Sequence, residues 1–264
     1  MQAELDKLAG MVREARRIVV FSGAGISTES GIPDFRGPQG IWTKVDPREY
    51  YIDRFMASET SRRAYWQRAT TMYREILAAE PNRGHRAVAT LERMGKLGTV
   101  ITQNVDGLHQ RAGNSPEKVI ELHGSTLYVS CLSCGARHTR EAFQPRVSED
   151  GEAPPCDQCG GLMKPATISF GQQLEPETLE RAAEETALCD LFIVVGSSLQ
   201  VYPAAGYPLQ AVSNGVPLVI VNHQETPHDG YAELVLNASS GEVLGPVVDA
   251  LAADMTPEQV AVPN

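Results

Sequence analysis

Four of the five cysteines form two close pairs, and their spacing predicts a metal site. Two residues separate Cys131 from Cys134 and Cys156 from Cys159, and 21 residues lie between the pairs. Two such turns can present four thiolates to one zinc ion in tetrahedral geometry. Because sulfur would fill every coordination position, we expect a structural ion rather than a reactive one. The fifth cysteine, Cys189, is expected to be a small buried hydrophobe.

A glycine turn follows the first apolar run of the chain. Gly23-Ala24-Gly25 comes directly after this run, and Ser27 follows closely. Glycines let a backbone turn tightly and approach a diphosphate, whose charge is met by backbone amides. Thr28 occupies the place of the third glycine in the full dinucleotide fingerprint, so an ordinary strand-to-helix turn remains the competing interpretation.

The next loop combines an acid, an aromatic ring and a cation. Asp34, Phe35 and Arg36 lie within Gly31–Gly37, which also contains a proline. A loop of this composition can stack a ring on a ligand and place a guanidinium near phosphate. A turn held by a local ion pair between Asp34 and Arg36 would explain the same composition.

Polar residues stand where further apolar runs end, and this is where ligands bind in open parallel sheets. Gln103, Asn104 and Asp106 follow one such run. Their fixed donors and acceptors could hold ribose hydroxyls and an amide. Alternatively, Asn104 and Asp106 could simply cap the next helix.

Three later runs end in the same way. His123 follows one of them and could act as a general base near neutral pH, although a lone histidine is more often structural. Gly196-Ser197-Ser198 follows the second and Asn222 the third. The second glycine of a serine-hydrolase elbow is missing after Ser198, which argues against that class of enzyme.

The elements that must position these residues alternate along the chain. Apolar runs of strand length occur at 17–22, 98–103, 119–122, 191–196, 217–222 and 234–236, and helical spacing at 3–16, 85–94, 176–188 and 204–212. This pattern predicts an α/β protein with a Rossmann-like, mostly parallel sheet, a small inserted zinc ribbon and a helical module. The Rossmann-like domain is expected at 1–39, 85–125 and 165–253, the helical module at 40–84, the ribbon at 126–164 and a loose tail at 254–264.

The formal net charge of −10 argues against direct nucleic-acid binding, which requires a basic face. The cysteine segment itself, residues 131–159, carries five acidic and three basic residues, so a zinc ribbon that binds nucleic acid is disfavoured. No apolar run approaches the roughly 20 residues of a membrane helix. Since the first residues also lack a signal-peptide pattern, we expect a cytoplasmic protein without a membrane partner.

In combination, these segments resemble the sirtuins, a family of NAD-dependent protein deacylases. The matching segments occur in family order across about residues 15–240: Gly23–Ser27, Gly31–Gly37, Thr102–His109, His123-Gly124, the four paired cysteines, Phe170-Gly171, Gly196–Leu199 and Val221-Asn222. The resemblance implies NAD as a consumed co-substrate, one structural zinc ion, and acylated lysine side chains of proteins as substrates. The implied reaction transfers the acyl group to ADP-ribose and releases nicotinamide. A protein mono-ADP-ribosyltransferase on the same fold is the alternative.

The resemblance also implies roles for individual residues. His123 and Asn104 would be catalytic, and Phe170, Gly171 and Val201 would line the groove for acyl-lysine and peptide. The residues implied in cofactor binding are Gly23, Ala24, Gly25, Ser27, Asp34, Phe35, Arg36, Gln103, Asn104, Asp106, Gly196, Ser197, Ser198, Asn222 and Ser240.

The sequence of the helical module does not decide which acyl group is preferred. Some sirtuins that remove succinyl or malonyl groups carry Tyr-x-x-Arg there, to grip the acyl carboxylate. One alignment places this pair on Trp66 and Ala69, which would remove the grip. A shift of one residue places it on Tyr65 and Arg68, which match the motif.

Other departures are small. Gln172 stands in place of the usual glutamate, and Ser197 in place of the usual threonine. Phe35–Trp42 and Val219–Gln224 resemble a branch of nuclear mammalian sirtuins known for ADP-ribosylation and long-chain deacylation. Activity on long-chain acyl-lysine is therefore a further expectation.

Overall fold

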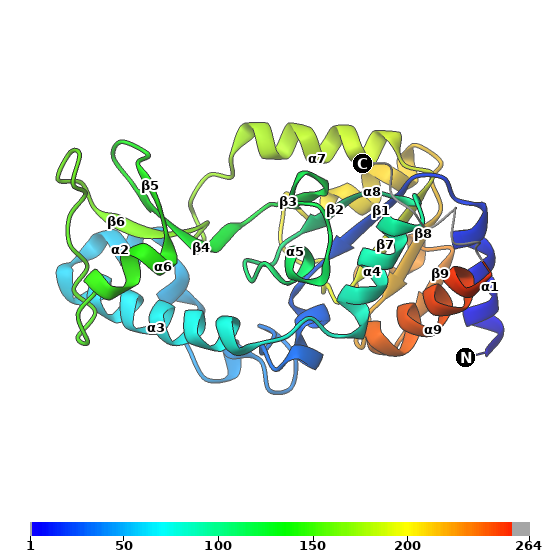
Figure 1. Cartoon of the computed structure of the whole chain (residues 1–264), viewed down its shortest axis with the longest axis horizontal. Helices are drawn as coiled ribbons and strands as arrows, with labels where there is room; N and C mark the ends of the chain where they lie inside the picture. Colours follow the sequence, from blue (N-terminus) through cyan, green and yellow to red (C-terminus); the bar gives the residue numbers. More distant parts are fainter. Residues whose placement is uncertain (1, 255–264) are drawn as a thin grey trace.

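The computed structural model describes residues 2–254, and a six-stranded sheet forms its larger part (Figure 1). Residues 255–264, which fall in the predicted loose tail, lie outside the described residues. The strand order is β3-β2-β1-β7-β8-β9, and every neighbouring pair is parallel. The strands are β1 (Ile18–Ser22), β2 (Leu97–Thr102), β3 (Val119–Glu121), β7 (Leu191–Val195), β8 (Leu218–Val221) and β9 (Leu234–Leu236).

Helices cover both faces of this sheet. One face packs against α1 (Gln2–Glu14), α4 (Arg83–Arg93) and α9 (Ser240–Ala253), and the other against α7 (Pro176–Leu188) and α8 (Gly206–Ser213). Within β1, Ile18 and Val20 face the first group, whereas Val19 and Phe21 face the second. A strand buried on both sides reads as a continuous apolar run, which is the signal seen in the sequence. The predicted Rossmann-like, mostly parallel sheet is confirmed.

A second, antiparallel sheet with the order β5-β4-β6 forms a lobe beside the first (Figure 1). Its strands β4 (Gly124–Cys131), β5 (Arg137–Thr139) and β6 (Met163–Thr167) lie against α2 (Ile52–Ala57), α3 (Glu59–Ala78) and α6 (Arg140–Phe143). Phe55 and Trp66 from the helices share one apolar core with Val129, Phe143 and Met163. The helical segment and the cysteine segment, predicted as separate excursions, therefore pack together.

Short elements complete the chain. They are α5 (Leu108–Ala112) and the 3-10 helices η1 (Ala24–Ser30), η2 (Ile41–Thr43), η3 (Pro47–Tyr50), η4 (Pro116–Lys118), η5 (Gln144–Arg146) and η6 (Asp229–Tyr231). The glycine turn after β1 leads into η1, a 3-10 helix rather than an α-helix. Among residues 2–254, no helix has the length and apolar character that crossing a membrane would require.

Candidate functional site

The glycine turn after β1 packs directly against the turn after β7. The Gly25 N–H donates to the Gly196 carbonyl oxygen at 2.8 Å, and the Gly23 N–H donates to the Val195 carbonyl oxygen at 3.0 Å. A Cβ on Gly25 would lie 2.7 Å from the Gly196 Cα, so only glycine permits this approach. The turn predicted to meet a diphosphate and the turn at Gly196 are therefore one structural unit.

We expect Gly25→Ala to destabilise the fold by about 1–3 kcal/mol and to weaken dinucleotide binding, because the added methyl group forces the two turns apart. Gly10→Ala is the matched control, since nothing lies within 4 Å of a Cβ at that position of α1 and alanine favours a helix. Thermal unfolding and calorimetric titration with NAD measure the two effects. Equal stability and affinity in the two variants would contradict this description of the turns.

A buried polar network follows the ends of β1 and β2. The Ser27 hydroxyl donates to the Asp106 Oδ2 at 2.7 Å, and the Asn104 Nδ2 donates to the Gly23 carbonyl oxygen at 3.1 Å and to the Ser27 Oγ at 3.2 Å. Burial raises the pKa of Asp106 above its usual value, against the opposing effect of its hydrogen bonds. The Asp106 Oδ1 also accepts from the Leu108 N–H, so Asp106 satisfies the first backbone amide of α5, whose N-cap is Gly107.

His123 is joined to this region by two hydrogen bonds in series. Its Nδ1 lies 3.0 Å from the Gln103 carbonyl oxygen, which can only accept, so Nδ1 carries the proton. The Gln103 Nε2 in turn donates to the Ser197 Oγ at 2.8 Å. Burial lowers the pKa of His123 below 6.5, with the Gln103 bond opposing it in part. The ring is therefore neutral at physiological pH, and its Nε2 lone pair is free to accept a proton.

A cavity of about 330 Å³ opens where the ends of β1, β7 and β8 meet. Five residues predicted to bind a cofactor line it: Gly25, Asp34, Gly196, Asn222 and Ser240. Small and polar residues therefore surround a space next to the glycine turns, as a bound nucleotide would require. The fold thus brings predicted residues that follow β1, β7 and β8 to one cavity. The predicted residues after β2 and β3, which are Gln103, Asn104, Asp106 and His123, do not line it.

The sequence allowed two interpretations of the loop after η1, a ligand-binding loop or a turn held by an ion pair between Asp34 and Arg36, and the geometry bears on the second. The Asp34 Oδ1 accepts from the Gly37 N–H at 2.9 Å, and the ion pairs of residues 2–254 do not include one between Asp34 and Arg36. Burial lowers the pKa of Arg36. Phe35 packs on Trp42 with ring centroids 5.0 Å apart. The Asp34–Arg36 pair is therefore not what holds this loop.

The remaining predicted residues lie around this centre. Phe170 packs against Trp42 and precedes Gly171, which has a φ of 77°. Val201 lies in the turn before α8, where its carbonyl oxygen accepts from the Ala205 N–H at 2.9 Å. Ala24 begins η1, and Ser198 follows Ser197 without a side-chain hydrogen bond of its own within the described chain.

Sequence reasoning missed several residues of this region. Thr28, His223 and Gln224 line the nucleotide-sized cavity, and the last two could have been found because they directly follow Asn222 at a strand end. Glu121, at the end of β3, was also missed. Burial raises its pKa to about 7, although Ser125 and Gln110 hydrogen-bond its carboxyl group.

We expect Glu121→Gln to stabilise the fold above pH 7 by about 1–3 kcal/mol, and to have little effect at pH 4.5. A raised carboxyl pKa means that the folded state holds a proton that the unfolded state releases, so this contribution to stability is lost as pH rises from about 4.5 to about 7. Urea unfolding at pH 5 and pH 8 measures the difference, with the exposed Glu117→Gln as the matched control. A pH-independent difference would contradict the assignment.

The four paired cysteines meet in the smaller lobe. Their sulfur atoms all lie within 4.8 Å of one another, with 3.5 Å from the Cys131 Sγ to the Cys159 Sγ and 3.7 Å from the Cys134 Sγ to the Cys156 Sγ. Sulfurs bound tetrahedrally at about 2.3 Å from zinc would have separations of this size. The cluster therefore fits one zinc ion with four thiolate ligands and no open position.

Known proteins resemble this chain over nearly its whole length. The profile of the Sir2 family matches residues 23–203. An NAD-dependent protein deacetylase 1 from Bradyrhizobium diazoefficiens is 48% identical, over 94% of this chain and 96% of the relative. An NAD-dependent protein deacylase 2 from Archaeoglobus fulgidus is 43% identical, over 94% of this chain and 96% of the relative.

Solved structures agree with the sequence relatives. A Sir2 homologue in complex with NAD superposes with a TM-score of 0.83 at 36% identity, covering 94% of both chains. A Sir2 complex with a p53 peptide and NAD+ has a TM-score of 0.83 at 39% identity, covering 95% of this chain and 99% of the other. The matched profile, the identities and the shared fold establish that this chain belongs to the Sir2 family.

Proposed function

We propose that this chain is an NAD-dependent protein-lysine deacylase, which transfers the acyl group to ADP-ribose and releases nicotinamide. The observation that carries the proposal is the hydrogen-bonded path from His123 through Gln103 to Ser197. This path links a neutral imidazole to Ser197, which directly follows Gly196 of the turn that lines the cavity. A base of this kind suits removal of a proton from a sugar hydroxyl.

Each strand end has a role in the proposal. Bound NAD supplies an activated ribose carbon with nicotinamide as its leaving group. Gln103 and Asn104 orient that ribose, Asp106 binds the carboxamide, and the Nε2 of His123 accepts a ribose hydroxyl proton. The residues that hold the rest of the dinucleotide are Gly23, Ala24, Gly25, Ser27, Asp34, Phe35, Arg36, Gly196, Ser197, Ser198, Asn222 and Ser240, while Phe170, Gly171 and Val201 line the acyl-lysine groove.

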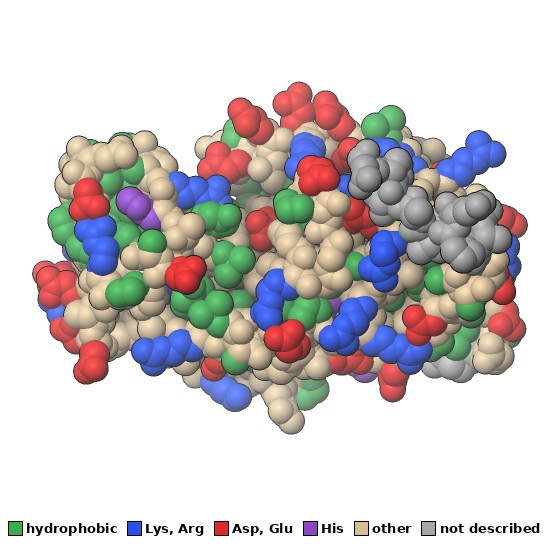
Figure 2. All heavy atoms as spheres, in the orientation of Figure 1, with side chains coloured by type: hydrophobic (Ala, Val, Ile, Leu, Met, Phe, Trp, Pro, Cys, Tyr) green, Lys and Arg blue, Asp and Glu red, His purple; other side chains and the backbone are tan. Residues whose placement is uncertain are grey.

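Acylated lysine side chains of proteins are the proposed substrates. The names of the relatives and the Sir2 complex with a p53 peptide support this class. Figure 2 shows acidic side chains gathered over α7, and this helix carries Glu177, Glu180 and Glu184 in exposed positions. Such a surface attracts lysine-rich segments and repels nucleic acid. A cytoplasmic location is part of the proposal. Its support is the cysteine usage, in which four cysteines fit a zinc site and none of the described cysteines forms a disulfide.

Product analysis tests the proposal against its alternative. Purified protein is incubated with adenylate-labelled NAD and an acetyl-lysine protein, and the label is followed into small molecules and into protein. We expect labelled O-acetyl-ADP-ribose together with deacetylated lysine. Label attached to protein without deacetylation would favour the mono-ADP-ribosyltransferase instead.

The acyl-group preference can be measured as turnover of acetyl-, succinyl- and long-chain acyl-lysine peptides, and two observations on the helical module predict the outcome. Trp66 and Ala69 are buried, and the Trp66 Nε1 donates to the Met163 carbonyl oxygen at 3.2 Å. The Arg68 Nη2 lies 3.3 Å from a Glu49 carboxylate oxygen, so its charge is already matched. We propose uncharged acyl groups, including long chains, over succinyl. Faster turnover of the succinyl peptide would overturn this preference.

A further inference from the structure

A short segment of the helical module is joined by its backbone to the proposed acyl-lysine wall. The Phe170 N–H donates to the Tyr50 carbonyl oxygen at 3.0 Å, and the Ile52 N–H donates to the Phe170 carbonyl oxygen at 2.9 Å. These bonds form a parallel bridge between Tyr51 and Phe170. Both backbone polar groups of Phe170 are therefore held by residues 50–52, and its position depends on theirs.

Aromatic rings connect the same segment to the loop that carries Phe35. The Trp42 ring lies 5.0 Å from that of Phe35, 5.0 Å from that of Tyr50 and 6.2 Å from that of Phe170, measured between centroids. Tyr50 also meets Phe35 edge to face at 6.2 Å. The proposed cofactor loop and the proposed acyl-lysine wall thus share one aromatic cluster. Within it, Tyr50 contacts Phe35 and Trp42.

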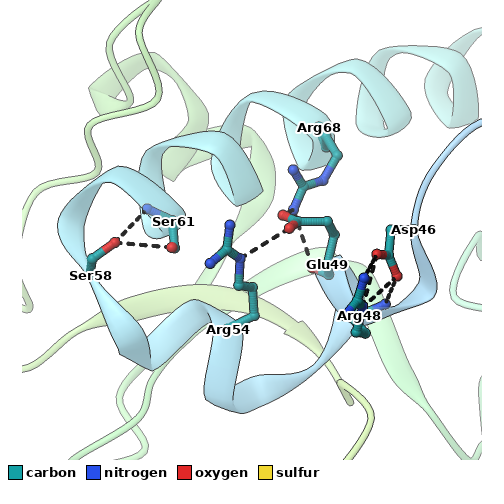
Figure 3. A network of polar contacts seen from close by, with 7 residues as sticks. All are labelled: Asp46, Arg48, Glu49, Arg54, Ser58, Ser61 and Arg68. Atoms are coloured by element: carbon teal, nitrogen blue, oxygen red, sulfur yellow. Dashed lines mark hydrogen bonds and ion pairs between the residues drawn. The ribbon is translucent and has the colours of Figure 1, made fainter.

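Glu49 fixes the start of this segment to two helices (Figure 3). One of its carboxylate oxygens accepts from the Arg54 Nε of α2 at 3.0 Å, and the other lies 3.3 Å from the Arg68 Nη2 of α3. The same Arg68 nitrogen donates to the Glu49 backbone carbonyl at 3.2 Å. The Glu49 side chain is 27% exposed, so water screens these pairs only in part.

We propose that Glu49 is a positioning residue for acyl-lysine binding, acting through Tyr50, Tyr51 and their backbone bonds to Phe170. The inference rests on the proposed function, because Phe170 lines the acyl-lysine groove only within that proposal. Removing the Glu49 charge weakens its side-chain contacts with Arg54 and Arg68, leaves the Arg68 bond to the Glu49 backbone carbonyl in place, and loosens the segment. Small displacements of a binding wall have large kinetic effects even when the fold persists.

The chain offers a matched control in the same segment. Asp46 pairs with Arg48 at 2.6 Å, but the pair is exposed, spans only two residues and joins no second element (Figure 3). Asp46 also caps η3 by accepting from the Arg48 N–H, and asparagine retains that ability. Asp46→Asn therefore removes an ion pair of the same chemistry without releasing Tyr50 or Tyr51.

Steady-state kinetics of Glu49→Gln and Asp46→Asn with an acetyl-lysine peptide test the proposal. We expect Glu49→Gln to raise the KM for the peptide roughly 10-fold with kcat nearly unchanged, and Asp46→Asn to leave both unchanged. Glu49→Asp, which keeps the charge, should recover part of the loss. Equal KM values in the two variants, or a loss confined to kcat, would overturn the positioning role.

Amide hydrogen exchange gives a readout that does not depend on activity. The Phe170 and Ile52 amides should exchange faster in Glu49→Gln than in Asp46→Asn. Their hydrogen bonds join residues 50–52 to Phe170, and these bonds open more often once the Glu49 anchor is weakened. Unchanged exchange would refute the inference even if the enzyme is active. Faster exchange in a protein that shows no peptide-dependent release of nicotinamide would instead support the link and refute the proposed function.

Discussion

Replacing His123 by alanine is expected to lower acyl-peptide-dependent release of nicotinamide and deacylation by about 10²–10⁴-fold. The reason is the position of the imidazole, whose Nδ1 donates to the Gln103 carbonyl oxygen and leaves Nε2 as the free acceptor. Alanine removes this acceptor without disturbing the core, since His123 is only half-buried. NAD binding, which depends on the glycine turns, should change much less.

The pH dependence of wild-type activity also tests the role of His123 as the base. Because burial lowers the pKa of His123, the neutral form persists below pH 6.5, and the acid side of the profile should fall at a lower pH than a free imidazole predicts. His138→Ala is the matched control, because His138 lies in the smaller lobe, where it packs against Phe143. Comparable losses in the two variants, or an acid limb unchanged in His123→Ala, would count against His123 as the base.

Loss of one zinc ligand is the second large effect that we expect. Cys156→Ser should abolish stoichiometric zinc and destabilise the smaller lobe by about 4 kcal/mol or more. Cys156 is buried in the core that also contains Trp66 and Phe143, so disorder at the cluster spreads into that core. The stacking of Trp66 on Phe143, with centroids 5.7 Å apart, should then be lost and the tryptophan exposed to water.

Zinc content by atomic absorption and tryptophan emission during urea unfolding measure these changes. Cys189→Ser is the control: Cys189 is buried but lies outside the cluster, and burial raises the pKa of its thiol to about 11. It should keep its zinc. A Cys156→Ser protein with full zinc content and native emission would contradict a four-thiolate site.

The sequence was sufficient for the parts of the fold whose signal is local. Runs such as 191–196 predicted strands buried on both faces, because a covered parallel sheet shows no polar alternation. The rule that strand ends share one edge predicted that Asn104 would lie near the glycine turn after β1, and its Nδ2 donates to the Gly23 carbonyl oxygen. The cysteine spacing likewise predicted the cluster of sulfur atoms, since both turns are short and local.

Contacts between distant segments could not be predicted in this way. The bond from His123 to the Gln103 carbonyl depends on the register of β2 and β3, which pairs Thr102 with Glu121. The shared core of Trp66 and Met163 joins segments that the sequence presents as separate excursions. Glu49 belongs to no sequence motif. Its proposed role depends on the bridge between Tyr51 and Phe170, two residues that only the tertiary structure brings together.

The stoichiometry of the reaction tests the central claim, that the sheet edge binds one dinucleotide with the His123 imidazole beside it. Nicotinamide, deacylated lysine and O-acyl-ADP-ribose are quantified together by mass spectrometry, with NAD and an acetyl-lysine peptide as substrates. The account predicts equal amounts of all three products in the wild type, and none without the peptide. Nicotinamide release that is independent of the peptide, or no consumption of NAD at all, would contradict it.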